Sequence, residues 1–183
     1  MTYTVHTVES APEAARASLA EAKKRFGFLP NLLGVMSEAP ALLKAYRTLS
    51  GIFEESSLNA SERQVVLLTT SYQNGCEYCV AAHSVIATMQ KVPGDVVQAI
   101  RDDKPIADRR IEALRRFTAA VVTSRGWPSD EETAAFLKAG YARQQVLEVV
   151  LGVGFKTLSN YTNHIAETPL DEAFSKAAWS KAA

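Results

Sequence analysis

Two cysteines and one histidine near the middle of the chain could carry chemistry. Cys76 and Cys79 form a C-x-x-C, and His83 follows Cys79 by four positions. Residues three, four and seven apart share one face of a helix, so the two thiols and the imidazole are expected to lie together. Asn74 and Gly75 interrupt the preceding pattern. A new helix is therefore expected to begin at about Cys76, with both cysteines in its first turn.

A helix N-terminus suits a reactive thiol. Free backbone N–H groups there stabilise a thiolate, so Cys76, nearer the helix end, is expected to be the more acidic of the two. His83 adds a base whose pKa lies near neutrality. One thiolate can attack the O–O bond of a hydroperoxide to give a sulfenic acid, and the second thiol condenses with it to a disulfide. The pattern predicts peroxide reduction at an exposed helical rim, with a separate reductant reopening the disulfide.

Two other interpretations of the cysteine pair are open, and a third, a thioredoxin fold, is set aside. A zinc site would need a fourth ligand besides the pair and His83, which His164 or Glu62 could supply if the fold brought one of them in. The thiols could instead be small core side chains without chemistry. A thioredoxin fold requires βαβ flanks, whereas the sequence on both sides of the motif is helical. We expect no metal and no cofactor.

The composition argues against charged polymers as partners. The chain has 183 residues, 47% of them apolar, and twenty basic residues balance twenty acidic ones. This length can bury one core, and a balanced charge draws the chain neither to nucleic acid nor to anionic membranes. The first residues lack an apolar signal segment, and no stretch approaches the ~20 apolar residues that span a bilayer. We therefore expect a cytoplasmic protein without nucleic-acid or membrane partners.

The periodicity predicts an all-α bundle. Apolar residues recur three and four apart nearly throughout, and a break is expected at residues 26–31, which contain Gly and Pro. A single domain is expected over 1–183, with an N-terminal helix and loop in 1–35, a helical core carrying the C-x-x-C in 36–166 and a tail in 167–183. The expected helices cover residues 9–25, 40–55, 60–72, 76–92, 93–101, 108–124, 129–139 and 142–164, with a final short helix from Pro169 or Asp171.

Glu62, Tyr78 and His164 have side chains that could take part in a reaction, but we favour structural roles for them. Asn59 can cap the helix that follows it and Glu62 can reach back, which makes a capping box. The Tyr78 phenol could donate a hydrogen bond to a peroxide or thiolate, but packing on the helix is the favoured use. His164 lies near the end of a long helix, where a cation is ordinary, and could at most support residues that touch the reactants.

The segment from Gly75 to His83, GCEYCVAAH, resembles the C-x-x-C-x-x-x-H core of the AhpD-like alkyl hydroperoxidases, which are grouped with the carboxymuconolactone decarboxylases. Residues 26–31, 160–164 and 168–170 extend the likeness over most of the chain and suggest the branch labelled peroxidase-related. The resemblance implies an AhpD-like helical bundle with the C-x-x-C at the N-terminus of a central helix. It also implies a homo-oligomer, a trimer or hexamer, and an antioxidant peroxidase whose disulfide is restored by a protein or small dithiol reductant.

The resemblance also implies roles for single residues. In the family the more C-terminal cysteine, here Cys79, attacks the peroxide and Cys76 resolves the product, which differs from the helix-end argument. The family carries a glutamate of a proton relay twelve residues before the first cysteine, and that position is Gln64 here. An amide takes no proton at neutral pH, though it can hold a water or orient His83. Well-known members have a histidine where this chain has Tyr78.

Two rival functions fit the same fold. A cofactor-free decarboxylase-like lyase would rely on histidine and acidic groups without needing both sulfurs. A non-enzymatic redox-sensing module would use the disulfide only to switch conformation, with Gln64 in place of the relay acid. The favoured hypothesis is a thiol peroxidase and disulfide oxidoreductase that uses Cys76 and Cys79, with His83 assisting proton transfer. Full activity of either single cysteine variant would exclude that two-thiol cycle.

Overall fold

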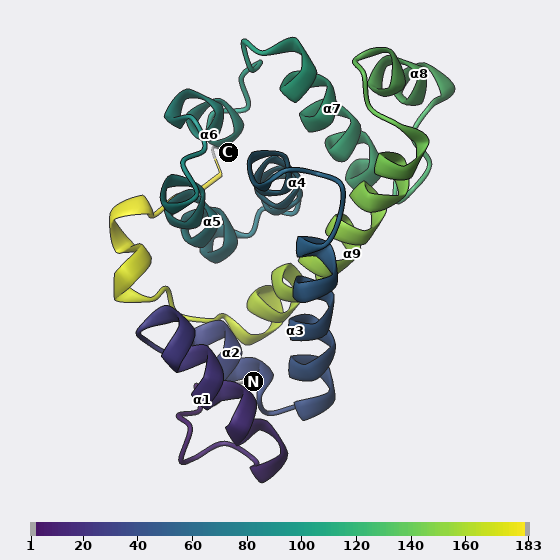
Figure 1. The fold of residues 1–183 in the computed structure, drawn as a ribbon. Helices are drawn as coiled ribbons and strands as arrows, with labels where there is room; N and C mark the ends of the chain where they lie inside the picture. The colour runs from purple at the N-terminus through teal and green to yellow at the C-terminus, as the bar shows by residue number, and fades with distance from the viewer. Residues whose placement is uncertain (1–2, 182–183) are drawn as a thin grey trace.

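The computed structural model describes residues 3–181, and all regular secondary structure in that range is helical (Figure 1). This confirms the all-α prediction. The elements are α1 (Glu13–Phe26), α2 (Asn31–Met36), α3 (Pro40–Glu54), α4 (Ala60–Gln73), α5 (Glu77–Met89), α6 (Gly94–Arg101), α7 (Arg109–Thr123), α8 (Asp130–Lys138), α9 (Arg143–Ala166) and a 3-10 helix, η1 (Glu172–Ala177).

Most expected helices lie within a few residues of their predicted bounds, and three differences have physical reasons. The first helix begins later than predicted, because Thr7 and Ser10 exchange hydrogen bonds in a turn and Pro12 occupies the N-cap. Helix α2 was not predicted, since six residues are too few to show a helical period, and Leu32–Met36 are all buried. The expected final helix does start after Asp171, but as a 3-10 helix.

Helix α4 is the centre of the bundle. It packs against α3, α5, α6, α7 and α9, and Figure 1 shows it surrounded by them. All residues of α4 from Gln64 to Ser71 are buried, as expected for a helix that has no continuous polar face. The predicted capping box is present: Asn59 Oδ1 accepts from the Glu62 backbone N–H at 3.0 Å, and the Glu62 carboxylate accepts from the Asn59 N–H at 2.9 Å. Local sequence thus fixes where this central helix begins.

The long helix α9 changes character along its buried face. Its first half packs apolar residues against α3 and α4, and Gly152 marks the closest approach, because a Cβ there would lie 2.7 Å from Phe53 and 2.8 Å from Val66. Its second half buries Lys156, Ser159, Asn160 and Asn163. The second half of α9 therefore places polar side chains in the interior of the protein.

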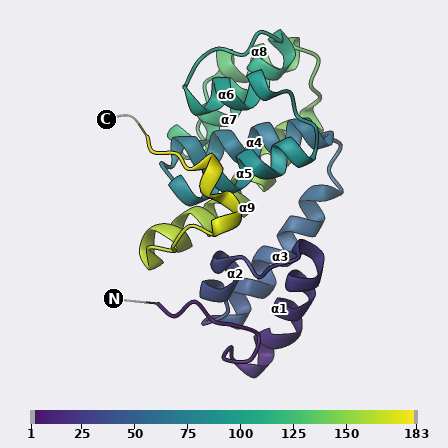
Figure 2. The ribbon, with the colours of Figure 1, turned by 90° about the vertical axis from the view of Figure 1, so that its left-hand side faces the viewer.

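The N-terminal helices and the C-terminal segment pack together beside α5. Helices α1 to α3 gather at one end of the molecule and α6 to α8 at the other, while the C-terminal segment runs along α5 (Figure 2). Phe174 of η1 belongs to the same buried cluster as the two cysteines and residues of α1 and α2. Within residues 3–181 no helix is long and apolar enough to cross a membrane.

Candidate active site

The C-x-x-C lies where the sequence predicts it, at the start of α5. Gly75 adopts a left-handed φ of 66°, which glycine tolerates and which turns the chain between α4 and α5. Cys76 is the N-cap residue and Cys79 lies in the first turn, and both thiols are free. Each cysteine is only 1% exposed. The prediction that the cysteines lie on an exposed helical rim is therefore wrong. The sequence could not show that α2, α9 and Phe174 cover this helix end.

Polar groups from α9 reach both sulfurs. The Asn163 amide donates to Cys79 Sγ at 3.2 Å and approaches Cys76 Sγ at 3.7 Å. The Cys79 thiol group also lies 3.7 Å from the Ser159 hydroxyl. Asn163 Oδ1 is buried and has no hydrogen-bond partner in the described residues, so it can accept a hydrogen bond from a small bound hydroxyl group.

The two sulfurs differ in acidity, because the groups around them act on their pKa values in opposite directions. Burial alone would raise the pKa of Cys79, but the Cys76 thiol, which donates a hydrogen bond to it, and the Lys156 ammonium outweigh burial and hold that pKa well below its ordinary value. The same thiol hydrogen bond, together with burial, raises the pKa of Cys76. Cys79 is therefore the thiolate and Cys76 the thiol. The helix-end argument favoured Cys76 as the more acidic thiol, whereas the hydrogen bond between the two sulfurs lowers the pKa of Cys79 and raises that of Cys76.

His83 is neutral and oriented by the amide at position 64. Its Nδ1 lies 2.9 Å from Gln64 Oε1, and Gln64 Nε2 donates in turn to Gln90 Oε1 at 3.2 Å. Since the amide oxygen only accepts, Nδ1 carries the proton and Nε2 keeps its lone pair. Burial and the charge of Lys156 lower the pKa of His83 well below its ordinary value. In the described part of the chain its hydrogen bond is to Gln64 rather than to either sulfur.

The Tyr78 phenol bonds to the C-terminal segment and to the start of α2. Its hydroxyl donates to the Asp171 carboxylate at 2.5 Å and accepts from the Leu32 backbone N–H at 3.3 Å. Asp171 also accepts from the Asn31 N–H at 3.0 Å. The Tyr78 ring packs edge-on against Phe174. The packing role favoured from the sequence is therefore present, and the hydrogen bonds join three distant segments.

The sequence and the fold are similar to those of known proteins. Residues 40–114, which include the C-x-x-C and His83, match the carboxymuconolactone decarboxylase family. A solved structure described as an alkylhydroperoxidase AhpD core, an uncharacterized peroxidase-related protein from Ralstonia eutropha JMP134, superposes with a TM-score of 0.83 at 22% identity, over 98% of this chain and 97% of that one. The chain therefore has an AhpD-like fold, and its residues 40–114 are similar to the carboxymuconolactone decarboxylase family.

Other solved structures of this fold carry different names. An uncharacterized peroxidase-related protein from Silicibacter sp. TM1040 gives a TM-score of 0.79 at 16% identity, over 94% of this chain and 93% of that one. A cysteine-to-alanine variant of the debrominase Bmp8, solved in complex with 2,3,4-tribromopyrrole, gives 0.80 at 20% identity over 97% and 96%. No curated protein matches the chain. At these identities the likeness is one of fold.

This AhpD-like chain departs from the expected relay and offers other polar groups. Gln64 stands where the resemblance implies a glutamate, and Lys156, Ser159 and Asn163, which the sequence reasoning missed, surround Cys79 instead. Their spacing of three and four residues was a usable signal, because it continues the face of α9 that carries Val149 and Gly152. A buried polar stripe on such a face indicates partners inside the protein.

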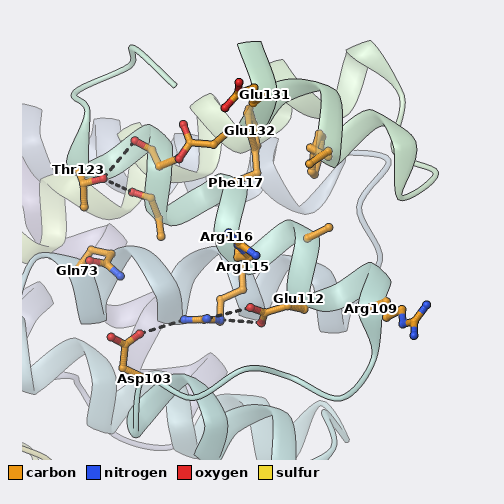
Figure 3. Close-up of a pocket in the computed structure, with 15 residues that line it drawn as sticks. Gln73, Asp103, Arg109, Glu112, Arg115, Arg116, Phe117, Thr123, Glu131 and Glu132 are labelled. Carbon is orange, nitrogen blue, oxygen red and sulfur yellow. Dashed lines mark hydrogen bonds and ion pairs between the residues drawn. The ribbon is translucent and has the colours of Figure 1, made fainter. Parts of the chain in front are cut away.

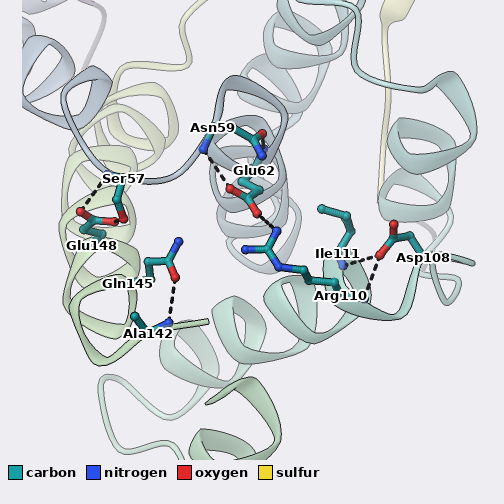
Figure 4. A network of polar contacts seen from close by, with 9 residues as sticks. All are labelled: Ser57, Asn59, Glu62, Asp108, Arg110, Ile111, Ala142, Gln145 and Glu148. Carbon is teal, nitrogen blue, oxygen red and sulfur yellow. Dashed lines mark hydrogen bonds and ion pairs between the residues drawn. The ribbon is translucent and has the colours of Figure 1, made fainter. Parts of the chain in front are cut away.

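Two predicted residues of this AhpD-like chain lie in other surroundings. Glu62 is buried in a network with Asn59 and Arg110, whose guanidinium also covers the Tyr141 ring at 4.0 Å (Figure 4). Its contacts serve the start of α4 and its packing on α7. His164 is exposed on α9 beside Tyr161. Neither residue has a recorded contact with the sulfurs among residues 3–181.

Among the described residues the thiols belong neither to a group that could hold a metal ion nor to a surface groove. The zinc alternative requires a group of at least three His, Cys, Asp or Glu side chains that could hold a metal ion. In the range 3–181 no such group is present. A groove of about 580 Å³ lies along α7 and α8 (Figure 3). There Arg115 is paired with Glu112 at 2.8 Å and Asp103 at 3.0 Å. None of the cysteine-site residues lines it, so the groove and the thiols are separate features.

Proposed function

We propose that this chain is a thiol-dependent peroxidase that cycles between a dithiol and a Cys76–Cys79 disulfide. The observation that carries the proposal is the convergence of the Asn163 amide and the Lys156 ammonium on Cys79, beside a second free thiol. Donors and a cation around one sulfur favour a thiolate, the reactive form toward peroxides. Matches to the carboxymuconolactone decarboxylase family and to peroxidase-related structures support the same reaction class.

The proposed cycle has three steps. The Cys79 thiolate attacks the nearer oxygen of a hydroperoxide ROOH, the O–O bond breaks, and the second oxygen takes a proton and leaves as ROH. Cys79 is then a sulfenic acid, which the Cys76 thiol attacks to form the disulfide and release water. A protein or small dithiol reduces the disulfide by exchange and leaves as its own disulfide. His83, neutral with a free Nε2 lone pair, is the base that assists proton transfer from Cys76.

The surroundings of the thiols favour organic hydroperoxides. The buried cluster that contains both cysteines is lined by apolar side chains of α1, α2 and η1, among them Leu33, Met36 and Phe174. Such a lining accepts an alkyl or aryl group, while Asn163 Oδ1 can accept a hydrogen bond from the peroxide O–H. Because a debrominase shares the fold, 2,3,4-tribromopyrrole is a useful comparison substrate.

We also propose that the protein works as a homo-oligomer, a trimer or hexamer. One face of α9 exposes Leu147, Val150, Tyr161 and Ile165, and an assembly would remove these apolar side chains from water. Light scattering coupled to gel filtration should give a multiple of the monomer mass. A monomer at micromolar concentration would contradict this part of the proposal.

The test of the function is turnover by single cysteine variants. Cys79→Ser should lose reduction of cumene hydroperoxide with dithiothreitol, because the attacking sulfur is gone. Cys76→Ser should also lose turnover but should accumulate one sulfenic acid on Cys79, which dimedone traps and mass spectrometry locates. Met89→Ser, which removes an exposed sulfur from the same helix, is the matched control and should be unaffected.

Other results would favour the rival functions. A lyase would keep its activity in both cysteine variants, and a redox sensor would form the disulfide rapidly while turning over peroxide slowly. If either single cysteine variant keeps full peroxidase activity, the two-thiol cycle is wrong.

A further inference from the structure

Lys156 is a charged side chain placed where charge is costly. It lies on α9 and is 1% exposed. It lies on the same buried face of α9 as Ser159 and Asn163, both of which contact Cys79. The groups that act on its ammonium are the two sulfurs and the Tyr46 phenol of α3. Within residues 3–181 it forms no salt bridge to a carboxylate. Since an unpaired buried ion costs several kcal/mol, the Cys79 thiolate is the anion that allows this ammonium to stay charged.

The neighbouring titratable groups do not compete for that role. Burial raises the pKa of Tyr46, so its phenol is neutral, and His83 is neutral because burial and Lys156 lower its pKa. The Cys76 thiol keeps its proton. Burial would lower the pKa of Lys156, but the Cys79 thiolate offsets this and raises it above the ordinary value. The reduced site therefore holds one ion pair, Lys156 with Cys79.

We propose that Lys156 is the acid of the peroxide step: it pairs with the Cys79 thiolate in the reduced protein and gives its proton to the leaving oxygen, so the pair discharges as the disulfide forms. This rests on the proposed peroxidase function. Lys156 ammonium, Cys79 thiolate, Cys76 thiol and ROOH become Lys156 amine, the disulfide, ROH and water. The ammonium proton completes ROH, and the thiol proton goes to water, so solvent supplies none.

Formation of the disulfide removes the anionic partner of Lys156, and this favours loss of the lysine proton. An ammonium left there would be a buried, uncompensated charge, so the oxidised protein favours the neutral amine. Reduction by a dithiol returns two protons, one to the Cys76 sulfur and one to Lys156. Lys156 thus supplies the proton that Gln64, an amide, cannot supply.

Two substitutions separate charge from proton donation. Lys156→Arg keeps a cation, but a guanidinium does not give up its proton in proteins. Alkylation of Cys79 by iodoacetamide, which needs no proton, should stay within a few-fold of the unaltered protein at neutral pH. Peroxide turnover should fall by about 100-fold or more, the typical contribution of a general acid. Lys156→Met should slow both reactions, and Lys138→Met, on the exposed part of α8, should slow neither.

Nitrogen NMR of the lysine side chains tests the same idea without any substitution, should a variant fail to fold by circular dichroism. At one neutral pH a buried lysine nitrogen should have the shift of an ammonium in the reduced protein and of an amine in the disulfide form. Wild-type turnover in Lys156→Arg, or an ammonium that persists after oxidation, would overturn the proposal. If only the cysteine variants lose turnover, the peroxidase function stands without this role. If the cysteine variants keep it, the function itself fails.

Discussion

The two sulfurs of this site differ in their contacts with side chains of another helix. Cys76 and Cys79 share one helical turn, yet Ser159 of α9 contacts Cys79 alone, and the Asn163 amide lies nearer to Cys79 than to Cys76, at 3.2 against 3.7 Å. A donor or cation near a sulfur favours the thiolate, so the helix that supplies these groups selects the nucleophile. Single substitutions on α9 should then change the chemistry on α5.

Asn163→Leu should make Cys79 less acidic. The amide donates to the sulfur at 3.2 Å, and a hydrogen bond to a charged group is worth about 1.5–3 kcal/mol, which corresponds to a rise of roughly one to two units in the pKa of Cys79. The pH dependence of iodoacetamide alkylation measures this. Thr162→Val, whose hydroxyl bonds only to the Leu158 carbonyl within the described chain, serves as the control. An unchanged profile would show that Asn163 does not stabilise the thiolate.

Gln64→Glu should change the charge of His83. A carboxylate 2.9 Å from Nδ1 would favour the imidazolium, so the pKa of His83, which is lowered in the native site, should rise by about 1–3 units. The imidazole should then become protonated as pH falls toward that higher value, which ring NMR signals report. Gln90→Glu places a carboxylate one residue farther along the same hydrogen-bond chain and should have a smaller effect. No rise in the His83 pKa would mean that the amide does not control its protonation.

The helices differ in how far the sequence could predict them, for local reasons. The starts of α4 and α5 follow from adjacent residues, the capping box at Asn59 and the turn at Gly75, and both were predicted. Helix α2 exists because its residues are buried, a tertiary cause that a six-residue segment cannot reveal. The cysteine motif was likewise local, whereas the burial of its sulfurs and the contact with Lys156 depend on α9, about eighty residues away.

Two glycines of α9 should respond oppositely to alanine. A Cβ at Gly152 would lie 2.7 Å from Phe53, so Gly152→Ala should destabilise the protein by about 1–3 kcal/mol through overpacking. Gly154 has nothing within 4 Å of such an atom, so Gly154→Ala should stabilise by about 0.5–1 kcal/mol through helix propensity. Urea unfolding measures both. Equal effects of the two substitutions would contradict the close packing of α9 on α3 and α4.

The buried position of the sulfurs means that the fold itself controls access to them. Two segments far apart in the chain close over the start of α5, namely the start of α2 and the C-terminal segment with η1, and the Tyr78 hydroxyl of α5 bonds to both. Arg101 holds the far end of that segment, because its guanidinium donates to the Ala177 and Ala178 carbonyls at 3.0 and 3.1 Å. We therefore expect a substrate to reach the thiols through local opening of these segments.

Asp171→Ala should loosen this closure. The Asp171 carboxylate accepts from both Tyr78 and the Asn31 N–H, and each hydrogen bond to a charged group is worth about 1.5–3 kcal/mol. Losing them should raise the population of open molecules, so a bulky reagent such as Ellman's disulfide should label the thiols roughly tenfold faster or more. Glu172→Ala, at the exposed neighbouring position, should leave that rate unchanged. Equal rates for the unaltered protein and Asp171→Ala would show that access follows another route, since the step that exposes the sulfurs would not involve these contacts.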